Sequence, residues 1–95
     1  MAAYIIASIE VTDPVAYEEY RQRVPSIIAA FGGRYLARGG TAERLEGATA
    51  AHRVVVLEFP NMARLRAFFA SADYQPLIGV RQQASRSSLI AVEGL

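Results

Sequence analysis

The sequence predicts an α+β fold in which helices cover one face of a single antiparallel sheet. Three observations support this prediction. Stretches rich in β-branched residues lie near both ends and in the middle of the chain, helical patterns separate them, and glycine or proline stands at most boundaries. The resulting order, β-α-β-β-α-β with a further helical stretch before the last strand, is typical of a four-stranded ferredoxin-like sandwich. At 95 residues, the chain is expected to form one domain, residues 1–95.

The first strand is expected at residues 4–11, and a long helix follows it. Asp13 suits the N-cap of this helix, and Pro14 suits its first position, where a missing backbone donor costs nothing. Pro25 should kink the helix or loosen one of its turns, and Gly32-Gly33 should end it. Apolar side chains recur at helical spacing on one stripe: Tyr17, Tyr20, Val24, Ile27, Ile28 and Phe31.

The segment "FGGRYLARGG", residues 31–40, contains two arginines between two glycine pairs. A phosphate-binding loop requires the order strand, glycine loop, helix, so that amides at the helix start face the anion. Here a helix precedes the glycines and "RYLAR" follows as a short strand, so chain geometry explains them better than phosphate binding. A loop is then expected from Gly39 to about Ala51.

The second half of the chain repeats the pattern of strand and helix. "HRVVVLEF", residues 52–59, is the strongest strand, and Pro60 ends it. Asn61 can cap a second helix, whose apolar positions include Leu65 and Phe68, and a third, shorter helix is expected from "SADYQPL". The final strand is expected in "SSLIAVEGL", residues 87–95.

The composition argues against several classes of function. Ten arginines are scattered among nine acidic residues, with a net charge of +1, so the basic stripe of a nucleic-acid binder is missing. The apolar start of the chain is too short for a membrane span and has no basic leader, so we expect a cytoplasmic protein. Without cysteine and with a single histidine, the sequence indicates neither a metal site nor a cofactor.

Two helices can cover only one face of the sheet, and the other face is only partly polar. Alternation places Tyr4, Ile6, Val54 and Val56 on this second face. They would expose several hundred square ångströms of apolar surface, which is the size of an interface. We therefore expect a homodimer in which two sheets pack face to face as a dimeric α/β barrel. The alternative is a monomer whose arginine and glutamate side chains fold over this face.

A polar set shares the second face with those apolar residues: Ser8, Glu10 and Glu58, with Arg34 and Arg38 if the second strand presents Leu36 there. A carboxylate within an apolar strand needs a partner, and Arg34 or Arg38 is the natural one for Glu58. Such an arginine could receive an anionic or enol-type substrate, with Glu58 as a base whose pKa burial raises. The same pair could instead be structural and fix the register of the strands.

Other candidate residues are aromatic or basic. His52 has a pKa suited to proton transfer, although a lone histidine is more often a surface or capping residue. Tyr20 lies on the buried stripe, with its hydroxyl expected at a rim. Tyr74 and Arg81 are two helical turns apart on one face, where they could line a cavity mouth or pack the third helix onto the sheet.

The linked motifs "VTDPVAYEEY", "FGGRYLARGG", "LEG", "RVVVLEFPN" and "FFASADYQPL", followed by Arg81, resemble a family of small bacterial proteins known as domain of unknown function 1330. The resemblance covers residues 4–94. It implies a dimeric α/β barrel of ferredoxin-like fold, a group that includes cofactor-independent monooxygenases, muconolactone-type isomerases, haem-dependent enzymes and sensing domains. The haem and oxygenase alternatives gain little support here, because tryptophan is absent and His52 and Asn61 are the only matching candidates.

The family pattern corresponds to eight positions: Asp13, Tyr20, Gly33, Arg38, Gly47, Glu58, Tyr74 and Arg81. The leading hypothesis is a small organic, anionic ligand in a cavity between sheet and helices, with cofactor-free enol or proton-transfer chemistry. Arg38 would orient the ligand and Glu58 would move a proton. Tyr20, His52, Tyr74 and Arg81 would form the rim. The alternative is a non-catalytic binding or assembly module in which these residues stabilise the dimer.

Overall fold

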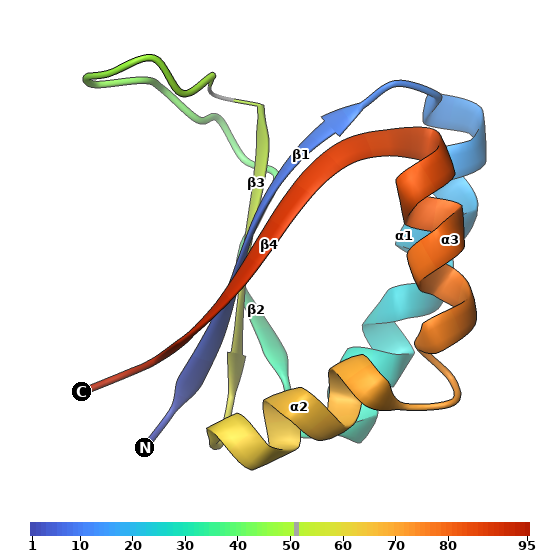
Figure 1. The fold of residues 1–95 in the computed structure, drawn as a ribbon, viewed down its shortest axis with the longest axis vertical. Coiled ribbons are helices and arrows are strands. Elements are labelled where there is room, and N and C mark those ends of the chain that lie inside the picture. Colours follow the sequence, from blue (N-terminus) through green and yellow to red (C-terminus); the bar gives the residue numbers. More distant parts are fainter. Residues whose placement is uncertain (51) are drawn as a thin grey trace.

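The computed structural model describes residues 1–50 and 52–95. The elements follow in the order β1 (Ala3–Val11), α1 (Pro14–Ala30), β2 (Arg34–Arg38), β3 (Arg53–Phe59), α2 (Met62–Ala70), α3 (Gln75–Ala84) and β4 (Ser85–Glu93). The strands form one antiparallel sheet in the order β2-β3-β1-β4. All three helices lie on the same side of this sheet (Figure 1). The α+β ferredoxin-like prediction is therefore confirmed, and the sheet of the single chain is open rather than closed into a barrel.

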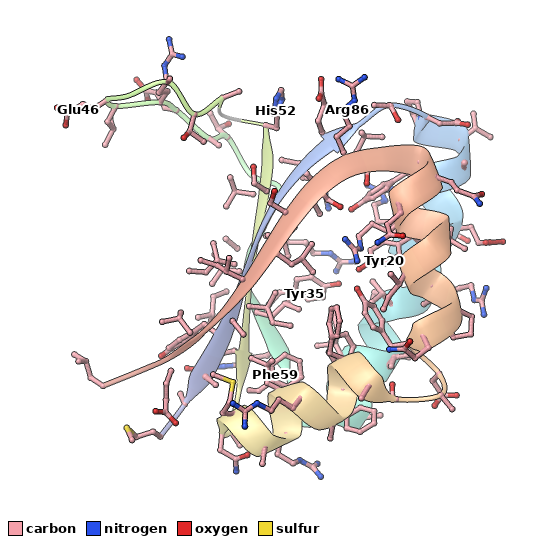
Figure 2. The ribbon with its side chains drawn as sticks, viewed as in Figure 1. Tyr20, Tyr35, Glu46, His52, Phe59 and Arg86 are labelled. Carbon is pink, nitrogen blue, oxygen red and sulfur yellow. The ribbon has the colours of Figure 1, made fainter. Side chains whose placement is uncertain are left out.

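The core lies between the sheet and the helices. Every second residue of the central strands faces this core, for example Ile5, Leu57 and Phe59. These side chains are buried together with Tyr20 and Phe68 of the helices. Figure 2 shows Tyr20, Tyr35 and Phe59 within this layer. The opposite side of the sheet, which we call the open face, has no helix over it in the described part of the chain (Figure 1).

Most predicted boundaries agree with the structure. Asp13 accepts a hydrogen bond from the Ala16 amide at 3.1 Å, and Asn61 accepts one from the Arg64 amide at 2.9 Å, so both act as N-caps. Gly32 leaves α1 with a φ of 79°, as expected of a helix exit. The predicted end of the loop at Ala51 lies outside the described residues.

The third helix was predicted to be shorter than the second, and this is wrong. α3 has 10 residues against 9 in α2, and it runs directly into β4, which begins two positions earlier than expected. Ser85 links the two elements, because its hydroxyl donates to the Arg81 carbonyl at 2.6 Å. This longer helix packs beside α1 and helps to enclose the space under the sheet.

A bulge in β2 decides which arginine faces which side. Arg34 lies opposite Glu58 and Tyr35 opposite Leu57, but the register shifts between Tyr35 and Ala37, so that Arg38 lies opposite Val55. The extra residue reverses the alternation of side chains. Arg38 therefore faces the helices, whereas Arg34 stays on the open face. The expectation that both arginines share one face is wrong, because a regular strand was assumed.

Candidate functional site

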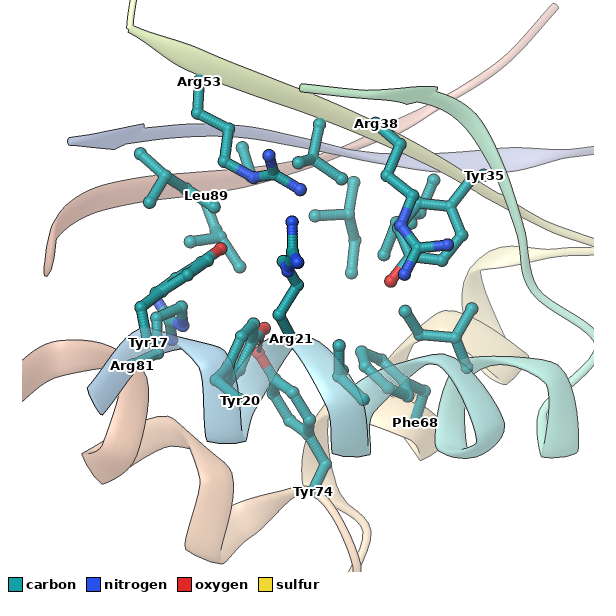
Figure 3. Close-up of a pocket in the computed structure, with 17 residues that line it drawn as sticks. Tyr17, Tyr20, Arg21, Tyr35, Arg38, Arg53, Phe68, Tyr74, Arg81 and Leu89 are labelled. Atoms are coloured by element: carbon teal, nitrogen blue, oxygen red, sulfur yellow. Dashed lines mark hydrogen bonds between the residues drawn. The ribbon is translucent and has the colours of Figure 1, made fainter. Parts of the chain in front are cut away.

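A cavity of about 40 Å³ lies between the sheet and the helices. Its polar lining consists of four arginines and four tyrosines: Arg21, Arg38, Arg53, Arg81, Tyr17, Tyr20, Tyr35 and Tyr74. We call it the arginine–tyrosine cavity. Figure 3 shows Arg38 and Arg53 extending from the strands toward Arg21, which extends from α1. Side chains such as Ile5, Leu57 and Phe68 complete the wall. The site is thus an apolar chamber that contains several cationic groups.

Two of the arginines have unused hydrogen-bond donors. Arg81 is only 4% exposed, and its Nη1 donates to Ser87 Oγ at 2.8 Å. The Nε atoms of Arg81 and Arg53 are buried and have no acceptor within the described part of the chain. A buried guanidinium without a countercharge is costly, so an arrangement of this kind favours an anion as its partner.

Neither a carboxylate nor an imidazole is among the described residues that line this cavity. Beside it lies an open depression of about 590 Å³, which we call the outer hollow, and the two share Arg21, Arg38 and Arg53. The outer hollow contains Glu18, whose carboxylate pairs with Arg21 at 3.1 Å. The three shared arginines therefore stand between solvent and the inner cavity.

Local packing holds the two strand arginines in place. The Arg38 guanidinium lies over the Tyr35 ring, 4.4 Å from its centroid, which is a cation–π contact. Gly39 has a φ of 71°, and a Cβ there would collide with the Arg53 guanidinium. Glycine at this position thus gives the chain its exit from β2 and leaves room for Arg53.

The tyrosines supply neutral hydroxyl groups. Tyr20 and Tyr74 are buried, and their hydroxyls share a hydrogen bond of 2.8 Å. Burial, with the neighbouring Tyr74, strongly raises the pKa of Tyr20. Burial also raises the pKa of Tyr17, against the opposing positive charges of Arg53 and Arg81. Both phenols therefore stay protonated at neutral pH and act as donors rather than bases.

This arrangement predicts a loss of stability at alkaline pH. The pKa of Tyr20 is raised in the fold above its ordinary value of 10.0, so its contribution is complete below pH 10 and declines as pH rises further. Urea unfolding measured between pH 8 and pH 11 should give a free energy of unfolding that is constant up to about pH 10 and falls above it. Tyr20→Phe should weaken this alkaline fall. An equal fall in the variant would show that other groups cause it.

The structure brings four of the predicted site residues together. Tyr20, Tyr74, Arg38 and Arg81 all line the arginine–tyrosine cavity. Tyr74 and Arg81 are both buried, but only Arg81 lies within α3, because the helix begins at Gln75 and Tyr74 is its N-cap residue. Both residues line the cavity, and Arg81 also joins α3 to the sheet through its hydrogen bond to Ser87 of β4.

Arg34 and Glu58 lie elsewhere, on the open face. Arg34 Nε donates to Glu58 Oε1 at 2.6 Å, with the arginine largely exposed. Of the two partners considered for Glu58, Arg34 is thus the one found. Because Arg38 lies on the other face, Glu58 and Arg38 cannot act on one ligand within the same chain. The hypothesis that pairs these two residues in one cavity is wrong for this reason.

His52 is exposed immediately before β3 and is not among the residues that line the cavity. Figure 2 shows it near the base of the long loop, away from Tyr20. Its neighbour Arg53, which was not among the candidate residues predicted from the sequence, lines the cavity instead. Arg53 lies two and four positions before the buried residues Val55 and Leu57, so strand alternation puts its side chain on the same buried side. A charged residue at a position that alternation assigns to the core was the signal that could have identified it.

Two kinds of feature are absent from residues 1–50 and 52–95. No cluster of three histidine, cysteine, aspartate or glutamate residues there is arranged to hold a metal ion. No helix in the same residues combines the length and apolarity needed to cross a membrane.

Comparison with known families shows which family the chain belongs to. The family described as "Domain of unknown function (DUF1330)" matches residues 2–95, so the protein belongs to this family. The resemblance noted from the sequence motifs is thereby confirmed. No curated protein matches the sequence.

Solved structures share the fold at low sequence identity. A protein of unknown function from Rhodopseudomonas palustris has a TM-score of 0.80 at 18% identity, covering 99% of this chain and 82% of its own. A dimeric ferredoxin-like protein of unknown function from Thermobifida fusca has a TM-score of 0.66 at 15% identity, with 99% and 92% covered. SnoaB, a cofactor-independent oxygenase from Streptomyces nogalater, has a TM-score of 0.66 at 14% identity, with 99% and 93% covered. At these identities the likeness establishes the fold alone.

Proposed function

We propose that this protein binds a small organic anion in the arginine–tyrosine cavity. The observation that carries the proposal is the pair of buried Nε donors on Arg53 and Arg81, which have no acceptor among the described residues. Buried polar groups are nearly always hydrogen-bonded, so each such group calls for an explanation. A bound carboxylate or other oxyanion would accept from both guanidiniums and supply the missing countercharge.

Each part of the site has a distinct role in this proposal. Arg53 and Arg81 hold the anionic group, and whichever hydroxyl accepts in the Tyr20–Tyr74 hydrogen bond keeps its own O–H as one further donor. Arg38 and Arg21 guide the ligand in from the outer hollow, which they line together with Arg53. The inner cavity holds about 40 Å³, so only part of a ligand is enclosed there and the remainder lies among the shared arginines.

The chemistry available in this cavity is the stabilisation of negative charge. Arginine and protonated tyrosine donate hydrogen bonds but do not abstract protons at neutral pH. The carboxylate of Glu58 and the imidazole of His52 lie outside the cavity lining. Binding of an anion, or stabilisation of an enolate-like state, therefore fits the site better than catalysis by a general base.

Calorimetry with benzoate tests the proposed function. Benzoate should bind, whereas benzamide, which has similar shape and no charge, should not bind measurably. Arg38→Ala should reduce benzoate affinity while leaving the assembly intact, and Arg23→Ala is the matched control, because Arg23 pairs with Glu19 outside this cavity. Equal binding of benzoate and benzamide would contradict the proposal.

We also propose that the protein is a homodimer joined through the open face. Ile6, Ile90 and Val92 are exposed apolar side chains on this face. No described element of the chain covers them, and a patch of this kind on a soluble protein marks an interface. Solved neighbours of the same fold are described as dimeric, which supports this interpretation.

Ile6→Glu should convert the dimer into monomers, because it buries a charge in the proposed interface. The measurement is mass by light scattering across a dilution series. Val15→Glu is the matched control, since Val15 is an exposed valine on α1, outside the open face. A wild-type mass equal to one chain, or an Ile6→Glu mass equal to two, would exclude this interface.

One observation favours a second candidate function, a non-catalytic assembly module. The Arg34–Glu58 pair lies on the open face, where it can fix the register of a second sheet against the first. Under this alternative, Glu58→Gln weakens the dimer and Arg38→Ala changes nothing. Under the anion-binding proposal, Arg38→Ala lowers affinity whether or not Glu58 contributes to assembly.

A further inference from the structure

The arginine–tyrosine cavity has a charge balance that bears on the ionisation of its ligand. The titratable groups facing it are Tyr17, Tyr20 and Arg21 from α1, Tyr35 and Arg38 from β2, Arg53 from β3, Tyr74 at the start of α3, and Arg81 within α3. β1, α2 and β4 contribute the apolar residues Ile5, Ala7, Ile9, Phe68 and Leu89. Four guanidiniums are thus opposed by one nearby carboxylate, Glu18 in the outer hollow, which Arg21 and Gln22 already engage.

We infer that the cavity binds weak oxygen acids, phenols or enolisable 1,3-dicarbonyl compounds, in their conjugate-base form. This inference rests on the proposed anion-binding function and names the class of ligand. A positive charge within a few ångströms favours the ionised form of an acid, typically by about one to three pKa units. The neutral acid would leave the Nε donors of Arg53 and Arg81 without a charged acceptor, so the protein binds the anion more tightly than the acid.

The apolar wall favours a delocalised anion over a compact one. Side chains such as Val24, Leu57 and Phe68 offer no hydrogen bonds to replace the hydration of an anion. A phenolate or enolate spreads its charge over several atoms and loses less hydration energy than a carboxylate when it enters such a space.

The proton released on binding goes to the solvent. Breaking the O–H bond of the ligand leaves the electron pair on oxygen, where the guanidiniums stabilise it. Burial raises the pKa of Tyr20, so its hydroxyl keeps its own proton and does not accept this one. The outer hollow connects the shared arginines with water, and buffer there takes up the proton.

The probe is 4-nitrophenol, whose phenolate absorbs visible light and which ionises near neutral pH. At a fixed pH below its pKa in water, adding the protein should increase phenolate absorbance, and a pH titration should give an apparent pKa lower by about one unit or more. A shift of one unit corresponds to about tenfold tighter binding of the phenolate than of the phenol.

Arg81→Met should abolish this pKa shift. Arg66→Met should keep it, because Arg66 lies on α2 and lines a different pocket, between α2 and β4. Arg38→Met is a second test variant at an exposed position, in case Arg81→Met fails to fold in a urea titration. Displacement of the nitrophenolate by benzoate would support both claims. Binding of benzoate without any shift for 4-nitrophenol would overturn this inference and leave the proposed function standing. Failure of both ligands to bind would overturn both.

Discussion

Replacing Phe68 with alanine should lower the free energy of unfolding by about 3–5 kcal/mol. Phe68 is 1% exposed, and its ring lies 4.4 Å from that of Tyr74 and 5.2 Å from that of Phe59, measured between centroids. It also packs edge-on against Phe31 of the α1 terminus. Removing the ring would leave a cavity among three aromatic side chains that come from separate parts of the fold.

The matched control for Phe68→Ala is the adjacent residue. Phe69 is 38% exposed, so Phe69→Ala removes the same atoms from the same helix with less loss of burial. Urea unfolding followed by circular dichroism should give a clearly smaller effect for Phe69→Ala. Equal losses for the two variants would mean that helix α2 does not present Phe68 to the core as described.

Replacing Arg81 with methionine should reduce the affinity for a bound anion by about thirtyfold or more, because truncating a buried charged partner costs about 2–5 kcal/mol. The same variant should keep the stability of the empty protein within about 1 kcal/mol of wild type. Arg81 makes one side-chain hydrogen bond, to Ser87, and its Nε has no acceptor among the described residues. A buried charge without a partner adds little stability to the empty protein.

The opposite responses of affinity and stability distinguish a binding residue from a structural one. Benzoate calorimetry gives the affinity, and urea unfolding of the same samples without ligand gives the stability. Arg66→Met controls for the loss of one surface charge. If Arg81→Met lost several kcal/mol of stability and kept its affinity for benzoate, Arg81 would be a structural residue and the anion site would lie elsewhere.

Local patterns in the sequence were sufficient to predict the topology. The helix caps Asp13 and Asn61 and the alternation in β1 and β3 depend on neighbouring residues, which the sequence displays directly. The length of α3 was less accessible. Its residues Gln82 and Gln83 carry no apolar periodicity, and the helix continues as far as Ala84 because it packs beside α1.

The composition of the site could be predicted only in part. Tyr20 and Arg81 lie on helix faces, and helical spacing places such side chains reliably. Tyr74 lies in the turn just before α3, as its N-cap residue. Arg38 and Glu58 lie on strands, where one inserted residue moves a side chain to the opposite face. The bulge after Tyr35 has no strong sequence signature, because neither Leu36 nor Ala37 is a residue that requires unusual backbone geometry.

The central claim is that Arg53 and Arg81 form an anion-binding site between the sheet and the helices. A crystal structure of the protein with 4-bromobenzoate tests it most directly, because the anomalous signal of bromine locates the ligand independently of the refined coordinates. We expect one bromine peak at the arginine–tyrosine cavity or the adjoining outer hollow, with the carboxylate accepting hydrogen bonds from both Nε atoms. A cavity without ligand, in which backbone carbonyls or ordered water satisfy both Nε atoms, would contradict the claim.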